Sequence, residues 1–283
     1  MKPVIYTSEW LRKTRSTALV YEQLHAALEH LGIEHHELPN TNDYWCRDYM
    51  PVHLCNGMYS SYNYNPDYLQ DEPQYITDQK AACLSIDIKM LTDMGIIFDG
   101  GNYVRCGGKI VLTDKVLMEN ASYPLADLLH HLQMALGGEI VLLPWDMNDR
   151  CGHADGMVAY LGDGRILLNN YRQMQGEDDA FYIRLKKILE AHFEVIELTY
   201  NCRPSIDSWC YLNYLEVPGG VLLPCLSKSF SCTNDKAAIE SFKNIFPNSE
   251  IIPIYARPLI KNGGALHCVT WEYYANEGRE DGE

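Results

Sequence analysis

A repeated order of elements restricts the fold of this sequence more than any other feature: strand, tight glycine turn, strand, helix, strand. Three copies have their predicted turns at Gly107-Gly108, Gly162-Asp163-Gly164 and Gly219-Gly220. In the first copy, the strands and the helix are predicted over 103–106, 109–113, 125–136 and 139–143. Glycine suits such turns because it adopts positive φ without steric cost. The chain is therefore predicted to contain a series of ββαβ units.

A fourth copy lies upstream, with strands predicted over 51–55 and 58–64 around the turn Asn56-Gly57. Successive turns are separated by 51, 55 and 57 residues, so a chain of 283 residues has room for five units. The fifth unit would be divided between a C-terminal strand within 266–274 and an N-terminal strand and helix within 4–6 and 17–31. A chain whose two ends complete one unit is predicted to close into a ring. We therefore expect an α/β fold of five ββαβ units around a central axis, with residues 1–283 forming a single domain.

Three aspartates occupy the same position in successive units. Asp48, Asp99 and Asp155 each lie eight residues before the turn of their hairpin, where the first strand is predicted to begin. Equivalent positions in a closed ring face the same end of the axis, so these carboxylates are predicted to meet in one cleft. Turn chemistry alone would account for one such aspartate, but less well for three in register. Because clustered buried carboxylates repel one another, the cleft is predicted to bind a cation.

Composition excludes several classes of function. The formal charge is −15 with a pI near 5.0, which argues against nucleic-acid binding, since that requires clustered Lys and Arg. No stretch has the roughly 20 apolar residues that a membrane span needs, and the N-terminus has no signal-peptide pattern, so a cytoplasmic location is expected. None of the ten cysteines forms a C-x-x-C pair, so zinc-ribbon and thioredoxin-type sites are not indicated. Most of these cysteines are expected to be reduced and buried.

Four local motifs precede the first strands of the predicted units. They are Trp45-Cys46-Arg47-Asp48-Tyr49-Met50-Pro51, Phe98-Asp99-Gly100-Gly101-Asn102, Cys151-Gly152-His153-Ala154-Asp155-Gly156 and Asn262-Gly263-Gly264-Ala265-Leu266-His267-Cys268-Val269-Thr270. They resemble the motifs of the agmatine deiminase and Porphyromonas-type peptidylarginine deiminase family, which belongs to the guanidino-modifying enzymes. That family carries W-x-R-D-x-x-P, [E/D]-G-G-N, G-H-x-D and G-G-x-x-H-C-x-T in this order. The resemblance covers Trp45 to Thr270 and implies a five-bladed pseudo-symmetric propeller, the pentein fold.

The resemblance also implies roles for individual residues. Cys268 resembles the family's nucleophile and His153 its general acid and base, and Asp99 resembles the group that orients His153. Asp48 and Asp155 resemble the carboxylates that hold the guanidinium. Further candidates for substrate binding are Trp45, Asn102 and, in a strand predicted over 211–217, Asn213. No metal and no organic cofactor is expected.

These residue types suit hydrolysis of a guanidinium. That group is planar and always protonated, so water attacks it poorly, whereas two carboxylates can grip its N–H edges. A cysteine can attack the carbon held between them, and a histidine can protonate the departing ammonia and then activate water. The product would be a ureido compound. Neighbouring carboxylates are expected to raise the pKa of Cys268, and an arriving substrate cation to lower it again.

Substrate identity and reaction type stay open at this stage. The segment 62–72 has no Arg or Lys to hold a substrate carboxylate, although Arg105, Arg150 or Arg203 could supply one. Agmatine, which has no carboxylate, is the first choice over arginine or peptidyl-arginine. His267 is expected to be structural, because neighbouring side chains of a strand point to opposite faces. An amidinotransferase or a non-catalytic guanidinium-binding protein are the alternatives. The sequence does not indicate an oligomeric state.

Overall fold

The computed structural model describes residues 2–54, 57–86, 88 and 91–274. Within these residues, fifteen strands form five three-stranded sheets, which we call blades one to five. Blades one and two are β3 (Val52–His53), β4 (Tyr59–Asn63) and β5 (Leu91–Ile97), then β6 (Val104–Cys106), β7 (Lys109–Thr113) and β8 (Glu139–Leu143). Blades three and four are β9 (Val158–Gly162), β10 (Arg165–Leu168) and β11 (Glu194–Glu197), then β12 (Leu215–Val217), β13 (Gly220–Cys225) and β14 (Glu250–Tyr255). Blade five is β15 (Trp271–Tyr273), β1 (Val4–Ser8) and β2 (His35–Leu38). This is the predicted five-bladed architecture.

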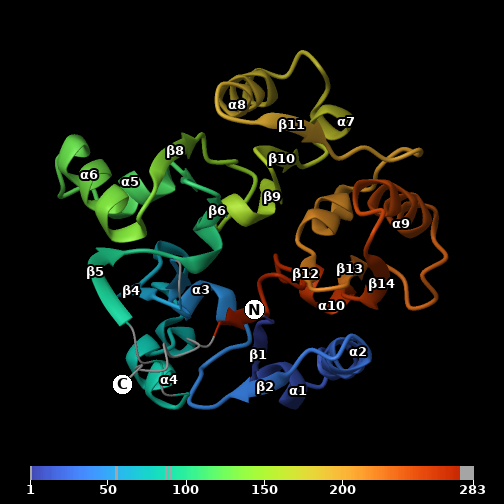
Figure 1. The fold of residues 1–283 in the computed structure, drawn as a ribbon, viewed down its shortest axis with the longest axis horizontal. Helices are drawn as coiled ribbons and strands as arrows, with labels where there is room; N and C mark the ends of the chain where they lie inside the picture. Colours follow the sequence, from blue (N-terminus) through green and yellow to red (C-terminus); the bar gives the residue numbers. More distant parts are fainter. Residues whose placement is uncertain (1, 55–56, 87, 89–90, 275–283) are drawn as a thin grey trace, which may run out of the picture.

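Each blade has the same pattern of strand pairing. Its middle strand runs antiparallel to the first strand and parallel to the third. A parallel pair needs a crossover connection, which a helix supplies in every blade. These crossover helices are α4 (Gln79–Leu84), α6 (Leu125–Leu136), α8 (Ala180–Glu190), α9 (Thr233–Ile245) and α2 (Ala18–His30). Figure 1 shows helices such as α6, α8 and α9 on the periphery, with β6, β9 and β12 toward the middle.

The crossover helices form because their sequences are amphipathic. In α6, Leu128, Leu132 and Leu136 repeat every four residues and are buried, whereas Met134 is exposed. The helix ends at Gly137, which has φ 64° and adopts the left-handed conformation typical of a C-terminal cap. This helix covers the predicted range, and so do the strands 109–113 and 139–143.

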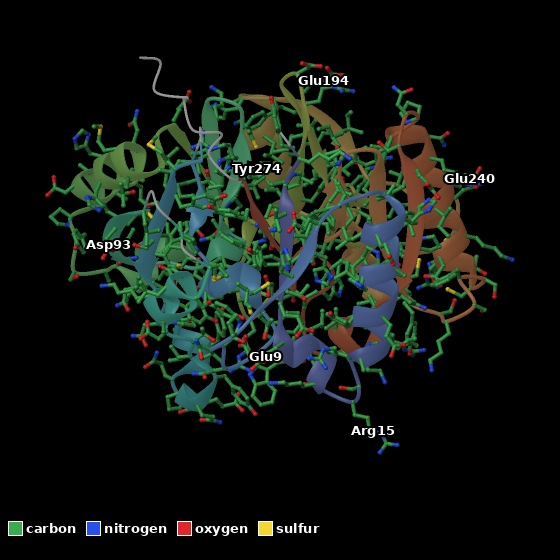
Figure 2. The ribbon with its side chains drawn as sticks, turned by 60° about the horizontal axis from the view of Figure 1, so that its bottom comes forward. Glu9, Arg15, Asp93, Glu194, Glu240 and Tyr274 are labelled. Carbon is green, nitrogen blue, oxygen red and sulfur yellow. The ribbon has the colours of Figure 1, made fainter. Side chains whose placement is uncertain are left out.

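The two ends of the chain complete blade five. β1 pairs antiparallel with β15, with Tyr6 opposite Trp271, and parallel with β2, with Ile5 opposite His35. The core is divided into three apolar clusters that join neighbouring blades. In Figure 2, Glu9 and Arg15 lie toward one edge of the molecule, and Glu194 and Tyr274 lie toward the opposite edge, where the hairpin turns are. Within the described residues, no helix is long and apolar enough to cross a membrane.

The remaining elements are single helical turns, several of which precede the first strands of blades. They are α1 (Glu9–Lys13), α3 (Cys46–Tyr49), α5 (Lys115–Glu119), α7 (Tyr171–Gln175) and α10 (Arg257–Ile260), with 3-10 turns η1 (Asp67–Leu69), η2 (Pro73–Tyr75), η3 (Gly100–Asn102), η4 (Ala154–Gly156) and η5 (Ile206–Leu212). The strand predicted over 211–217 is therefore wrong in its first half, because η5 occupies 206–212. The predicted turn residue Asn56 lies outside the described residues.

Candidate active site

Every blade places one polar side chain at the same end of the axis. Asp48 lies in α3, Asp99 directly before η3 and Asp155 in η4; Asn213 directly follows η5 and Cys268 lies in the loop before β15. All five are buried and come two to five residues before the first strand of their blade. The aspartates were expected at the start of these strands. They lie instead in or beside short helical turns, which direct them toward the axis.

His153 joins two of the three carboxylates. Its Nε2 lies 3.0 Å from Asp99 Oδ2, and its Nδ1 lies 3.6 Å from Asp48 Oδ1. Burial alone would lower the pKa of His153, but the negative charges of Asp48 and Asp99 and the hydrogen bond to Asp99 raise it to about 10. The imidazole is therefore protonated at neutral pH, and it can donate a proton but not accept one.

The carboxylates around His153 are not fully satisfied. Asp48 Oδ1 and Asp99 Oδ1 are buried and have no hydrogen-bond partner among the described residues. Burial raises the pKa of Asp48 to about 8; the charge of His153 opposes this rise, and those of Asp99 and Asp155 add to it. At neutral pH, Asp48 consequently holds a proton that a cation would displace. The cluster suits a ligand that brings both positive charge and N–H donors.

Asn213 fixes the loop that carries Cys268. Its Nδ2 donates to Cys268 Sγ at 3.2 Å, and its Oδ1 accepts from the backbone N–H groups of Ala265 and Cys268 at 3.1 and 3.2 Å. Asp155 Oδ2 lies 3.9 Å from the sulfur. Burial raises the pKa of the Cys268 thiol well above its usual range, and the charges of Asp155 and Asp48 raise it further. The direction is as predicted, although burial and not the carboxylates is the largest cause.

His267 belongs to the site, contrary to the sequence-based expectation. Residues 266–269 form a turn, with the Thr270 N–H donating to the His267 carbonyl at 3.2 Å, so the alternation of a strand does not apply. His267 Nδ1 lies 2.6 Å from Asp155 Oδ2. The error came from extending β15 backward through the nucleophile loop.

Two motif glycines permit close approach of the site loops. A Cβ atom at Gly101 would overlap the imidazole of His153 and lie 2.7 Å from Asp48 Oδ1. A Cβ atom at Gly264 would overlap the indole of Trp45. Trp45 is half-buried, and it thus lies against the glycine pair of the nucleophile loop. Its proposed contact with substrate stays a prediction.

Several residues that the sequence did not single out hold the loop of His153. Asn102, predicted to bind substrate, uses its Oδ1 to accept from the Thr113 N–H at 2.8 Å. The Thr113 hydroxyl donates to the Gly152 carbonyl at 2.6 Å. Asp149 accepts from the backbone N–H groups of Cys151 and His153 at 2.9 and 3.1 Å. The Asp149–Cys151 contact is an Asx turn, a local signal that could have identified Asp149.

Tyr68, in η1, forms a wall beside His153. The two ring centres are 6.0 Å apart, and the amino group of Lys115 lies 4.6 Å from the centre of the Tyr68 ring. Lys115 is buried and pairs with Asp67 at 2.9 Å and Glu119 at 3.3 Å, so two carboxylates balance its charge. This cation was not anticipated, because it comes from α5 and not from the segment 62–72.

The three arginines considered for carboxylate binding have different positions. Arg150 donates to the Tyr68 carbonyl and therefore lies at the wall of the site. Arg105, in β6, donates to the Tyr103 hydroxyl at 2.7 Å and lines a cavity along the axis. For Arg203, the structure records its carbonyl accepting from Asn234 at 3.2 Å.

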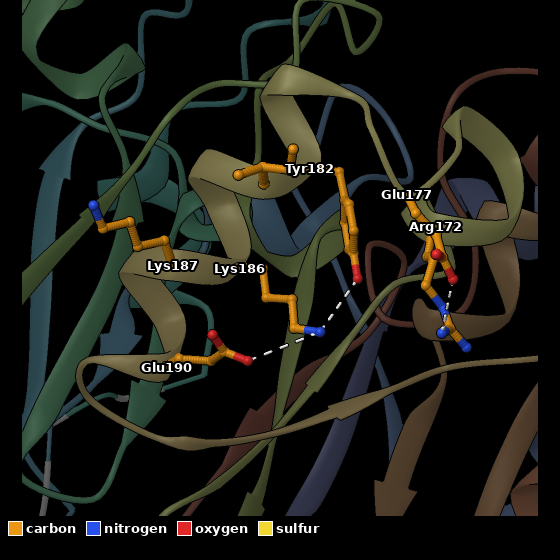
Figure 3. Close-up of a pocket in the computed structure, with 7 residues that line it drawn as sticks. Arg172, Glu177, Tyr182, Lys186, Lys187 and Glu190 are labelled. Atoms are coloured by element: carbon orange, nitrogen blue, oxygen red, sulfur yellow. Dashed lines mark hydrogen bonds and ion pairs between the residues drawn. The ribbon is translucent and has the colours of Figure 1, made fainter.

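A surface cavity of about 440 Å³ between α7 and α8 does not belong to this site. Figure 3 shows its lining, in which Arg172 pairs with Glu177 at 3.3 Å and Lys186 with Glu190 at 3.8 Å. None of the five axial residues lines it. In the described part of the chain, no group of three or more His, Cys, Asp or Glu side chains could hold a metal ion.

Comparison with known proteins agrees with this geometry. The sequence profile of the Porphyromonas-type peptidyl-arginine deiminase family matches residues 7–273. The chain belongs to this family. Agmatine deiminase of Pseudomonas fluorescens is 24% identical over 311 aligned positions, which cover 90% of this chain and 80% of that protein.

Solved structures show the same fold across the family. Agmatine deiminase of C. jejuni superposes with a TM-score of 0.70 at 18% identity, covering 97% of this chain and 94% of that one. A cysteine-to-serine form of the C. jejuni enzyme with substrate bound gives a TM-score of 0.71 at 17% identity, with coverage of 97% and 94%. Agmatine deiminase of Enterococcus faecalis gives 0.72 at 14% identity, covering 97% and 94%. These likenesses support the pentein fold of five small sheets.

Proposed function

We propose that this protein is a guanidino deiminase that hydrolyses a small cationic substrate to a ureido product and ammonia, acting as a single domain of residues 1–283. The observation that carries the proposal is a buried nucleophile, Cys268, at the end of the axis where Asp48, Asp99, Asp155 and His153 also lie. Family membership and the relatives named agmatine deiminase support the same reaction.

Substrate binding begins with charge neutralisation. Asp48 and Asp155 take the N–H edges of the guanidinium, and Asp48 loses its proton as the cation enters. The same cation lowers the pKa of Cys268, whose proton was held by burial and negative charge. The thiolate therefore forms when its target is in place.

The reaction then passes through a covalent intermediate. Cys268 Sγ attacks the guanidinium carbon, and the protonated His153, oriented by Asp99, gives a proton to the leaving nitrogen, which departs as ammonia. His153, now neutral, removes a proton from a water molecule that attacks the thiouronium carbon. The C–S bond breaks, and the ureido product and the thiolate are released.

Agmatine is the first candidate substrate. Lys115 is balanced by two carboxylates, and Arg150 donates to the Tyr68 carbonyl, so both cations at the wall are engaged. A substrate without a carboxylate needs neither of them. Binding to nucleic acid is not part of the proposal, and the cytoplasmic location stays a prediction.

A substrate panel tests the function. Agmatine, arginine, peptidyl-arginine and other guanidino compounds are incubated with the protein, and ammonia and ureido product are measured. We expect equal amounts of both, with the highest rate for agmatine. Amidino transfer to added glycine or ornithine with little ammonia would instead identify an amidinotransferase, and no turnover of any compound would overturn catalysis.

A further inference from the structure

The contact between His267 and Asp155 has no part in the reaction described above. His267 Nδ1 and Cys268 Sγ approach the same oxygen, Asp155 Oδ2, at 2.6 and 3.9 Å. The Asp155 side chain is 5% exposed, whereas that of His267 is 26% exposed. A buried carboxylate beside the nucleophile is thus joined to an imidazole that reaches solvent.

The solvent that reaches His267 lies in a cavity along the axis. This axial cavity has a volume of about 400 Å³, and first strands of all five blades contribute to its lining. Asp155 and His267 line it, and so does Tyr274, which lies at the hairpin-turn edge in Figure 2. Among the described residues, Cys268 and His153 are not part of its lining. His267 therefore exchanges protons with water on the side of Asp155 away from Cys268.

Three charged groups face His267. Asp155 forms the direct contact, and the Nε of Arg47 donates to the His267 carbonyl at 3.4 Å. Arg47 also pairs with Glu272 at 2.6 Å, and the charge of His267 contributes to lowering the pKa of Glu272, which burial opposes. His267 thus lies between two carboxylates and one guanidinium.

The charge state of Asp155 depends on this arrangement. Burial raises the pKa of Asp155, but the hydrogen bond and charge of His267, together with the charges of His153 and Arg47, outweigh burial and bring it below its usual value. Asp155 is therefore ionised at neutral pH, as a carboxylate that binds a guanidinium must be. Loss of His267 removes the largest of the lowering contributions and leaves burial less opposed.

We propose that His267 is a positioning residue that keeps Asp155 ionised and directs its carboxylate toward the reacting guanidinium. The proposal rests on the function proposed above, because it assigns Asp155 to the substrate. It differs from the sequence motif, which places His267 next to the nucleophile without giving it a task.

The first test needs no substrate. Asp155 is followed by NMR titration of its 13C-labelled carboxyl group, assigned with Asp155→Asn, in the wild type and in His267→Leu and His267→Asn. We expect the titration midpoint to rise by one pH unit or more in His267→Leu. His267→Asn keeps a donor near the Nδ1 position but no charge, so its midpoint should lie between the other two. An unchanged midpoint in a folded His267→Leu protein overturns the proposal.

The second test uses the pH dependence of kcat/KM for the best substrate of the panel. With Asp155 less easily ionised, the acid limb of His267→Leu should move to higher pH, with a loss of about tenfold near pH 6 that shrinks as pH rises. A merely structural role would give a loss independent of pH. His30→Leu, at an exposed histidine of α2, is the matched control and should follow the wild type. If the wild type turns over no guanidino compound, the proposed function fails, whereas the carboxyl titration still decides the role of His267.

Discussion

Blades one to three and blades four and five supply the reaction centre with different kinds of groups. The first three bring Asp48, Asp99 and Asp155, with His153 ion-paired to two of them. The last two bring Asn213 and Cys268, joined by neutral hydrogen bonds. The first group provides charge, and the second fixes the position of a sulfur. Charge can be replaced in part by solvent or a bound ion, whereas a misplaced nucleophile cannot be replaced.

The largest expected effect comes from the second group. Replacing Cys268→Ala removes the covalent route, so kcat for ammonia release should fall at least about a thousandfold. Guanidinium binding, measured by calorimetry, should persist because the carboxylates remain. Cys202→Ala, at a half-buried thiol outside the five axial positions, is the control and should retain activity. Substantial turnover by Cys268→Ala would mean that the carboxylates alone catalyse the reaction.

A smaller effect is expected at Asn213, which does not react. Asn213→Ala leaves the buried N–H groups of Ala265 and Cys268 without their acceptor, which should cost about 1–3 kcal/mol in denaturant unfolding. The freed loop should also lower kcat by about tenfold or more, since the sulfur is no longer held in place. Asn213→Asp keeps the acceptor, so its stability should lie closer to wild type. Equal destabilisation by both variants would show that the acceptor is not what holds the loop.

The same difference explains what could be predicted from sequence. The hairpin turns and the helix periodicity are local signals, so they give the blades, the closure by β1 and β15 and the register of the three aspartates. Asn213 and Cys268 are recognised through motif resemblance. Their roles in the loop depend on contacts between segments more than 50 residues apart.

His267 and Tyr68 show where local signals stop. His267 was excluded by assuming a strand, but the chain turns at 266–269 and brings the imidazole to Asp155. Tyr68 reaches His153 from η1, where Lys115 of α5 and Arg150 contact it. No spacing in the sequence links these segments, because side-chain packing and not periodicity brings them together.

The smallest change, and the one that couples the two groups, is the effect of a bound cation on Cys268. Burial and the charges of Asp155 and Asp48 raise the pKa of the thiol in the free protein, so the thiolate fraction, and with it the alkylation rate, should rise about tenfold per pH unit up to that raised value. A guanidinium ion between the carboxylates cancels part of their charge and should shift the alkylation profile to lower pH. The rate of iodoacetamide labelling of Cys268 against pH, with guanidinium chloride and with tetramethylammonium chloride as the matched salt, measures this shift. Tetramethylammonium has no N–H donors to satisfy Asp48 and should leave the profile unchanged. A profile that guanidinium does not move would mean that burial alone controls the thiol, and the carboxylate group would then serve binding without activating the nucleophile.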